Sequence, residues 1–133
     1  MLYQKYLEEV WGVLSGVAES QRESIVEAAR VIADRMERDG MLYVFGCGHS
    51  HLVGEDLFYR AGGSAAVCAM LDSDLMLHGG AVKSSCYERM PGLAKPIFER
   101  YGLTQRDVLM VSSTSGINSV PVEMAICARE KGI

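Results

Sequence analysis

The hydrophobic pattern of the chain changes its period once, near residue 40. Apolar residues recur at helical spacing over 2–18 and again from Ile25 to Met36. Between these stretches, Ser20-Gln21-Arg22-Glu23 is a capping box that predicts the start of the second helix, and Gly40 is suited to end it. Residues 1–40 are therefore expected to form an N-terminal helical hairpin.

After residue 40, short apolar runs alternate with amphipathic segments. Continuous apolar runs typical of strands buried on both faces lie at 41–45, 65–71 and 107–112. Helical patterns follow them, at 51–61, 91–101 and 120–131. Strands that alternate with helices predict a parallel sheet with right-handed crossovers. The expected fold class for residues 41–133 is therefore α/β, with three α-β-α layers.

Residues 72–90 form a long polar connection after the second predicted strand. Their glycines and mixed polarity predict an irregular loop, and loops of this length are often functional. The side chains of Lys83, Ser84, Ser85, Glu88 and Arg89 could order over a ligand as a lid. They could equally form a solvated polar loop, and the pattern does not separate the two.

Two unusual turns follow the first and third predicted strands. The first turn is Gly46-Cys47-Gly48-His49-Ser50, and the second runs from Ser112 to Ser119 with five hydroxyl residues, an asparagine and a glycine. Ligands of open parallel sheets bind at the carboxyl ends of the strands. Backbone N–H groups, helix dipoles and hydroxyl donors together suit a phosphate dianion. Hydroxyl residues also cap helices and turns, but their density here favours a phosphate site.

The common nucleotide motifs are incomplete. A dinucleotide fingerprint needs a third glycine at the position of His51, and a P-loop needs a lysine that is absent from both turns. Hydroxyl groups without a lysine favour a phosphate monoester over a nucleoside triphosphate. Asp72, at the end of the second predicted strand, is the one feature that favours NAD, so a NAD-binding half-domain stays an alternative. No cofactor is otherwise expected.

The two turns resemble the motifs of the SIS (sugar isomerase) domain family of phosphosugar isomerases and phosphosugar-binding proteins. The family's G-x-G-x-S after an apolar strand is matched by Gly46 to Ser50, and its S-x-S-G-x-[T/S/N] by Ser113 to Asn118. The resemblance covers about residues 20–133, and it is closest to a little-characterised bacterial branch with asparagine in the second loop.

The resemblance implies a flavodoxin-like parallel sheet of five strands, usually in a homodimer or homotetramer. Only three strands are found here, so the C-terminal strands are expected to be missing and the 133 residues to be part of a longer domain. The ligand is expected to be a phosphorylated sugar. The residues expected to bind it are Gly48, Ser50, His51, Ser113, Thr114, Ser115, Gly116, Asn118 and Ser119.

Two residues are candidates for proton transfer in an aldose–ketose isomerisation. Glu55 lies one turn into the helix after the first loop, and His78 lies in Leu77-His78-Gly79-Gly80 within the long connection. Either could instead be a solvent-facing side chain. The function is therefore expected to be a sugar-phosphate isomerase, with a non-catalytic sugar-phosphate sensor as the alternative.

Composition excludes several other classes of function. The net charge of −4 makes a poor nucleic-acid binder, and no apolar run approaches the roughly 20 residues that span a membrane. His49 and His51 lack a third ligand at suitable spacing, so no metal site is expected. The four cysteines form no CxxC pair, which favours reduced thiols in the cytoplasm.

Overall fold

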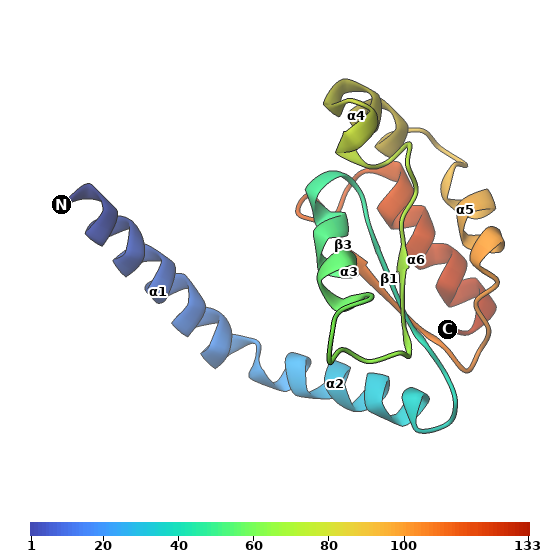
Figure 1. The fold of residues 1–133 in the computed structure, drawn as a ribbon, viewed down its shortest axis with the longest axis horizontal. Helices are drawn as coiled ribbons and strands as arrows, with labels where there is room; N and C mark the ends of the chain where they lie inside the picture. The colour runs from blue at the N-terminus through green and yellow to red at the C-terminus, as the bar shows by residue number, and fades with distance from the viewer. The chain divides into compact units, whose positions relative to one another are not determined.

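The structure, a computed structural model, describes residues 1–133 and divides into two compact units, Met1–Asp34 and Arg35–Ile133. The first unit contains α1 (Leu2–Ser20) and most of α2 (Arg22–Met36), drawn in blue in Figure 1. These are the two helices predicted for the N-terminal hairpin. Neither helix has a buried residue.

The boundary between α1 and α2 differs from the predicted capping box. Ser20 is the last residue of α1, and its hydroxyl donates to the carbonyl of Gly16 at 2.7 Å. A serine that bonds one turn back in this way no longer caps the following helix. The carbonyl of Gln21 instead accepts the N–H of Ile25 at 2.9 Å, so the predicted role of Ser20 is wrong.

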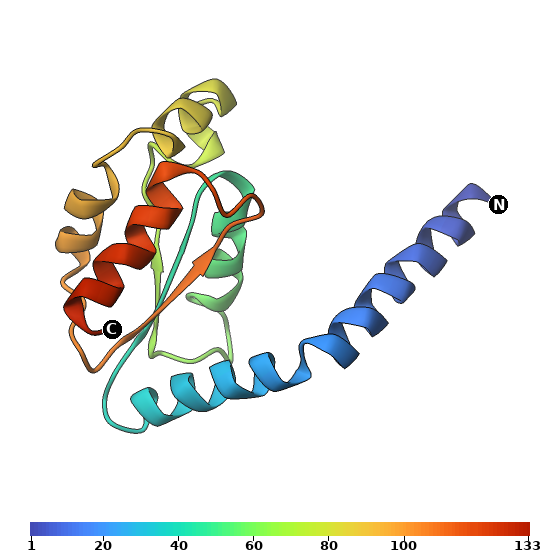
Figure 2. The same ribbon diagram turned by 180° about the vertical axis from the view of Figure 1, so that it is seen from behind.

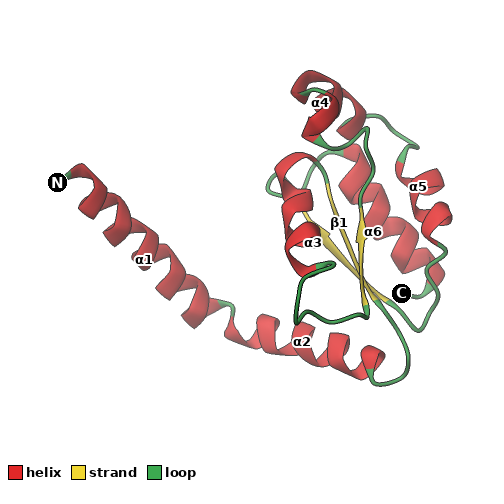
Figure 3. Ribbon diagram, viewed as in Figure 1, coloured by secondary structure: helices red, strands yellow, loops and turns green.

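The second unit contains a parallel sheet of three strands, shown in yellow in Figure 3. They are β1 (Leu42–Gly46), β2 (Val67–Met70) and β3 (Val108–Ser112), in the order β2-β1-β3. Leu42 is opposite Val67 on one side and Val108 on the other. The three predicted apolar runs therefore all form strands. The prediction that the third is buried on both faces is wrong, because β3 is an edge strand and each of its residues is only partly buried.

Helices cover both faces of this sheet. Figures 1 and 2 show α3 (Leu52–Leu57) on one face and α5 (Ala94–Tyr101) with α6 (Ser119–Lys131) on the other. The predicted three-layer α/β fold is confirmed. The helix after the first strand is shorter than predicted, because a 3₁₀ turn at Gly48–His51 precedes α3 and Phe58 after it is extended.

The long connection after β2 is more ordered than its sequence predicts. It contains a 3₁₀ turn at Leu77–Gly79 and the helix α4 (Ala81–Glu88). Ser84 is the only buried residue of α4. Because α4 buries a serine and no apolar stripe, its sequence lacks the helical pattern on which the prediction depends.

The core lies between the sheet and the helices α5 and α6. Its largest fully buried side chains include residues of β1, β2 and α6, namely Phe45, Met70, Val120 and Met124. Each buried side chain of this size contributes roughly 1.5–3 kcal/mol. Gly102 and Gly132 end α5 and α6 in the left-handed conformation, as the sequence predicts.

The strand order determines where a ligand can bind. β1 is the central strand, and the chain passes from it to β2 on one side and later to β3 on the other. The carboxyl ends of β1 and β3 therefore meet at the switch point of the sheet, where connections leave toward opposite faces. The two unusual loops follow these two strand ends.

Candidate functional site

A cavity of about 290 Å³ lies where the two loops meet. Three segments contribute to its wall: the loop after β1, the connection after β2 through Leu77 and α4, and the loop after β3. The lining residues are Cys47, Gly48, His49, Ser50, Leu77, Ser84, Ser85, Glu88, Thr114, Ser115 and Asn118. Five of the predicted binding residues are in this set, namely Gly48, Ser50, Thr114, Ser115 and Asn118.

The first loop has its shape because of two glycines. A Cβ on Gly46 would lie 2.5 Å from the backbone carbon and oxygen of Ser50, so only glycine allows the loop to fold back there. Gly48 has a φ of +54°, a left-handed conformation that glycine adopts without strain. The two glycines therefore place Ser50 at the edge of the cavity.

The hydroxyl and amide side chains near the loops fall into two groups. Ser50, Thr114, Ser115 and Asn118 line the cavity and make no side-chain hydrogen bond within the chain. Ser84 and Ser119, in contrast, donate to the carbonyls of Leu75 and Arg89 at 2.8 and 3.2 Å. The first group is available to a ligand, and the second holds α4 in place.

The amide groups of the two predicted glycines are already used within the protein. The N–H of Gly48 donates to the carbonyl of Leu75 at 2.8 Å, and the N–H of Gly116 donates to the hydroxyl of Ser113 at 3.0 Å. The backbone N–H groups of Thr114 and Ser115 have no such partner. Backbone help for an anion would come from these two residues and not from the glycines.

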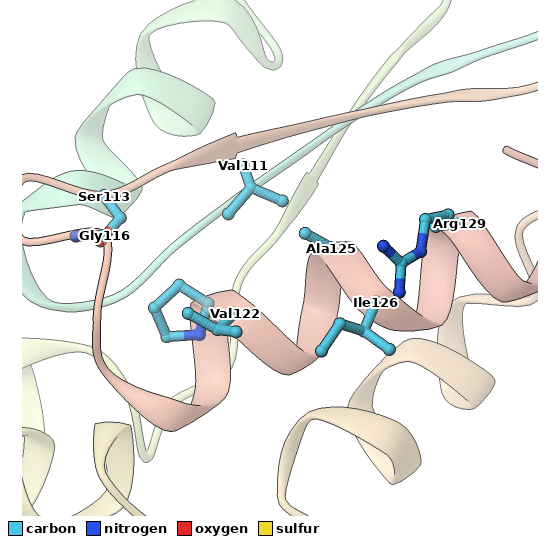
Figure 4. Close-up of a pocket in the computed structure, with 8 residues that line it drawn as sticks. Val111, Ser113, Gly116, Val122, Ala125, Ile126 and Arg129 are labelled. Carbon is cyan, nitrogen blue, oxygen red and sulfur yellow. Dashed lines mark hydrogen bonds between the residues drawn. The ribbon is translucent and has the colours of Figure 1, made fainter.

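Ser113 and Gly116 line a different hollow. This groove of about 470 Å³ lies between β3 and α6, and its other lining residues are Val111, Pro121, Val122, Ala125, Ile126 and Arg129. Figure 4 shows Val111 on β3 facing Ala125 on α6. The wall is mainly apolar, so Ser113 and Gly116 shape the second loop at the border of this groove.

The end of α4 forms one wall of the cavity, whereas the sequence left open whether these polar residues cover a ligand or form a solvated loop. Ser84, Ser85 and Glu88 all line the cavity from this helix. The polar residues of the connection are thus ordered over the site, on a helix whose buried Ser84 is bonded to the chain before it. No periodic signal in the sequence identifies these residues as lining.

The two candidate catalytic residues lie close to a shared neighbour, His51. This histidine is 5% exposed, and its Nε2 is 3.4 Å from Oε1 of Glu55. The ring of His78 is 6.0 Å from the ring of His51, centroid to centroid, at 53°. His51, Glu55 and His78 therefore form one cluster, although they come from the first 3₁₀ turn, from α3 and from the second 3₁₀ turn.

A hydrogen bond determines which ring nitrogen of His51 carries the proton. Its Nδ1 bonds to the carbonyl of Gly48, which can only accept, so Nδ1 carries the proton. Nε2 is buried and has no hydrogen-bond partner, although the Glu55 carboxylate is within ion-pair distance. None of the three cluster residues lines the cavity, but Gly48 and Leu77, which do, are directly connected to them.

The Cys47 thiol in the cavity is unreactive near neutral pH. Burial, with smaller contributions from the charges of Glu88 and Asp72, raises the pKa of Cys47 to about 12. A thiol is nucleophilic only as the thiolate, so Cys47 stays protonated and unreactive near neutral pH. Its place is in the floor of the site.

A comparison with protein families gives a match over almost the whole chain. Residues 5–133 match the family described as the SIS domain. The chain belongs to the SIS domain family. The resemblance of the two loops is thereby confirmed, and membership of this family supports a phosphosugar-binding role for the cavity between them.

Relatives of this SIS domain occur in several bacteria. A UPF0309 protein of Thermoanaerobacter pseudethanolicus is 46% identical over 131 residues, which cover 97% of this chain and 53% of that protein. A UPF0309 protein of Caldanaerobacter subterraneus is 46% identical over 129 residues, 96% of this chain and 52% of that protein. A third, from Brucella ovis, is 45% identical over 128 residues, 96% and 53% of the two chains. The chain spans about half the length of the curated relatives it matches.

Two further features bear on the remaining classes of function. No three or more His, Cys, Asp or Glu side chains lie together in a way that could hold a metal ion. None of the helices has both the length and the apolar character that crossing a membrane requires. His49 is exposed whereas His51 is buried, so the His-x-His pair does not converge on one point.

Proposed function

We propose that the cavity binds a phosphorylated monosaccharide and that the protein is a sugar-phosphate isomerase. The observation that carries the proposal is the convergence of Ser50, Thr114, Ser115 and Asn118, all without partners, on one cavity at the switch point. The volume of about 290 Å³ is at the lower end of small-molecule sites, roughly 300–1,000 Å³. It suits one sugar ring better than a dinucleotide.

The phosphate would be held without a lysine or an arginine. The hydroxyls of Ser50, Thr114 and Ser115 can donate to its oxygens, and so can the side-chain amide of Asn118. The partnerless N–H groups of Thr114 and Ser115 add to this cradle, just before the N-terminus of α6. Such a set of neutral donors suits a monoester.

The cluster beside the cavity supplies groups for isomerisation. In that reaction a proton leaves one carbon next to the carbonyl and is delivered to the neighbouring carbon, while a hydroxyl proton moves between the two oxygens. We propose Glu55 and His78 for these transfers, with the buried His51 packed between them, 3.4 Å from Oε1 of Glu55 and 6.0 Å from the His78 ring. His51, expected to bind the sugar, is assigned here to positioning because it is buried.

A binding-only role is the second candidate. Glu55 and His78 lie beside the cavity and not in its lining, and His78 is exposed. A sensor needs the cradle alone. The NAD reading has less support, because the carboxylate of Asp72 already accepts from Arg100 at 3.1 Å and from the N–H of Asp74 at 3.0 Å.

We also propose a cytoplasmic location and a homo-oligomeric assembly. The four cysteines are all free thiols, which supports a reducing, cytoplasmic environment. We expect a homodimer or homotetramer, since Leu7, Trp11 and Leu14 are exposed on α1, and large apolar patches mark association surfaces.

The test is a thermal-shift and calorimetric titration with aldose and ketose phosphates, the bare sugars, inorganic phosphate and NAD. A ligand at 100 times its Kd should stabilise the fold by about 2.7 kcal/mol. Ser115→Ala should lose this effect, whereas Ser24→Ala, which changes an exposed serine of α2, should keep it. If no sugar phosphate shifts the melting temperature, or if Ser115→Ala binds as well as wild type, the assignment of the cavity is wrong.

A further inference from the structure

The cavity wall contains one feature that a simple phosphate cradle does not explain. Glu88 is the only Asp, Glu, Lys or Arg residue among the lining residues. Its carboxylate makes no hydrogen bond and no ion pair within the chain. The neighbouring acids Asp72 and Asp74 are, in contrast, paired with Arg100 and Lys83. Glu88 is therefore a free negative charge beside a site built for an anion.

The position of Glu88 in its helix is electrostatically unfavourable. It is the last residue of α4, where the helix dipole is negative and a carboxylate is destabilised. It is also half-buried, and its charge contributes to the raised pKa of the Cys47 thiol in the cavity floor. A local cost of this kind with no compensating partner in the chain is typical of functional positions.

The backbone around Glu88 is held in place. The hydroxyl of Ser84 donates to the carbonyl of Leu75 at 2.8 Å, and the hydroxyl of Ser119 donates to the carbonyl of Arg89 at 3.2 Å. The carboxylate of Glu123 accepts the N–H of Gly92 at 2.9 Å. With α4 tied on both sides of residue 88, the backbone that carries the carboxylate is held at the cavity wall.

We propose that Glu88 is a specificity-determining residue that binds the protonated amino group of an amino-sugar phosphate. The inference rests on the proposed phosphosugar site. A neutral sugar phosphate would place a second negative charge near Glu88 without any positive charge between them. A ligand that carries its own ammonium group satisfies the carboxylate with a charge-assisted hydrogen bond, while its phosphate lies among Ser50, Ser115 and Asn118. Sugars that carry an acidic substituent would be repelled.

The experiment compares three probes by calorimetry: glucosamine 6-phosphate, glucose 6-phosphate and N-acetylglucosamine 6-phosphate. The first two differ only by an ammonium group in place of a hydroxyl, and the third removes the charge. Wild type should bind glucosamine 6-phosphate about tenfold more tightly than glucose 6-phosphate, a difference of about 1.4 kcal/mol. In Glu88→Gln this preference should fall to twofold or less, with the affinity for glucose 6-phosphate equal to or above that of wild type.

Glu130→Gln is the matched control, because it removes one negative charge from an exposed position of α6 outside the cavity. It should keep the wild-type preference. If sugar phosphates bind but wild type does not discriminate between the amino and hydroxyl forms, the inference is overturned and the phosphosugar site stands. A preference that survives in Glu88→Gln overturns it as well. Failure of all three probes, and of the wider sugar-phosphate panel, refutes the phosphosugar site itself.

Discussion

The carboxylate of Asp107 joins the starts of the two strands whose far ends carry the candidate site. Asp107 is 8% exposed, and its Oδ1 accepts the N–H of Met41, just before β1, at 2.9 Å. Its Oδ2 accepts the N–H and the hydroxyl of Thr104 at 2.7 and 2.8 Å. We expect Asp107→Asn to destabilise the second unit.

The magnitude follows from these three bonds. Hydrogen bonds to a charged group contribute roughly 1.5–3 kcal/mol each. An asparagine has one acceptor oxygen, so the Met41 N–H or the Thr104 pair must face an NH₂ group, and the remaining bonds lose their charge assistance. The free energy of unfolding should therefore fall by about 2–4 kcal/mol.

The Asp107 carboxylate also makes the free energy of unfolding depend on pH. Burial alone would raise the pKa of Asp107, but the hydrogen bonds from Met41 and Thr104, with the nearby Arg106 guanidinium, outweigh it and hold the pKa below its ordinary 3.8. A pKa that is lower in the folded chain than in the unfolded chain adds stability that is fully present above about pH 4. This stability is lost as the pH falls through the folded-state pKa.

Urea unfolding at neutral pH and along an acid series would measure both effects. Asp39→Asn is the control: it removes the same charge from an exposed left-handed position that asparagine tolerates, and it should change stability by less than about 0.5 kcal/mol. Wild type should lose stability below pH 4 more steeply than Asp107→Asn does. Equal stability of Asp107→Asn and wild type, or parallel acid profiles, would refute the reasoning.

Three further predictions concern the site. Gly46→Ala places a Cβ 2.5 Å from the Ser50 backbone. It should therefore lower the free energy of unfolding, measured in urea, by about 1–3 kcal/mol and weaken sugar-phosphate binding. Gly16→Ala is the control and should have neither effect, because there is open space around Gly16. Because its thiol has a pKa of about 12, Cys47 should react with iodoacetamide at pH 8 far more slowly than the exposed Cys86, as peptide mass spectrometry would show, and equal rates would contradict its burial. Glu55→Gln and His78→Ala should abolish the interconversion of an aldose phosphate and its ketose, measured by NMR, while binding measured by calorimetry persists. Full turnover in both variants would show that the cluster takes no part in the mechanism. Wild-type protein that binds the sugar phosphate without turnover would favour the sensor.

Elements with a strong local signal were predictable from the sequence. The apolar runs around Val44, Ala69 and Met110 are short and continuous, which favours strands of a parallel sheet, and all three form strands. Only the third is not buried as predicted, because β3 lies at the edge of the sheet. The helix ends at Gly102 and Gly132 depend on a left-handed residue that is local to the turn. The local signal did not predict α4, because the one buried residue of this helix is a serine. It gave the wrong role for Ser20, because the hydroxyl can either cap the following helix or bond to the carbonyl of Gly16 one turn back.

The location of the site also follows from the sequence, because two hydroxyl- and glycine-rich loops after parallel strands must lie at one edge of the sheet. Only the tertiary structure decides which side chains remain free there. Ser119 is engaged by a carbonyl 30 positions away in the sequence, whereas Ser115, four residues before it, has no partner. Likewise the approach of His51 to His78, and of Glu88 to the serines and Asn118 that line the cavity, depends on how distant segments pack. Residue type determines what a group can bond, and packing determines whether the chain itself has already used that bond.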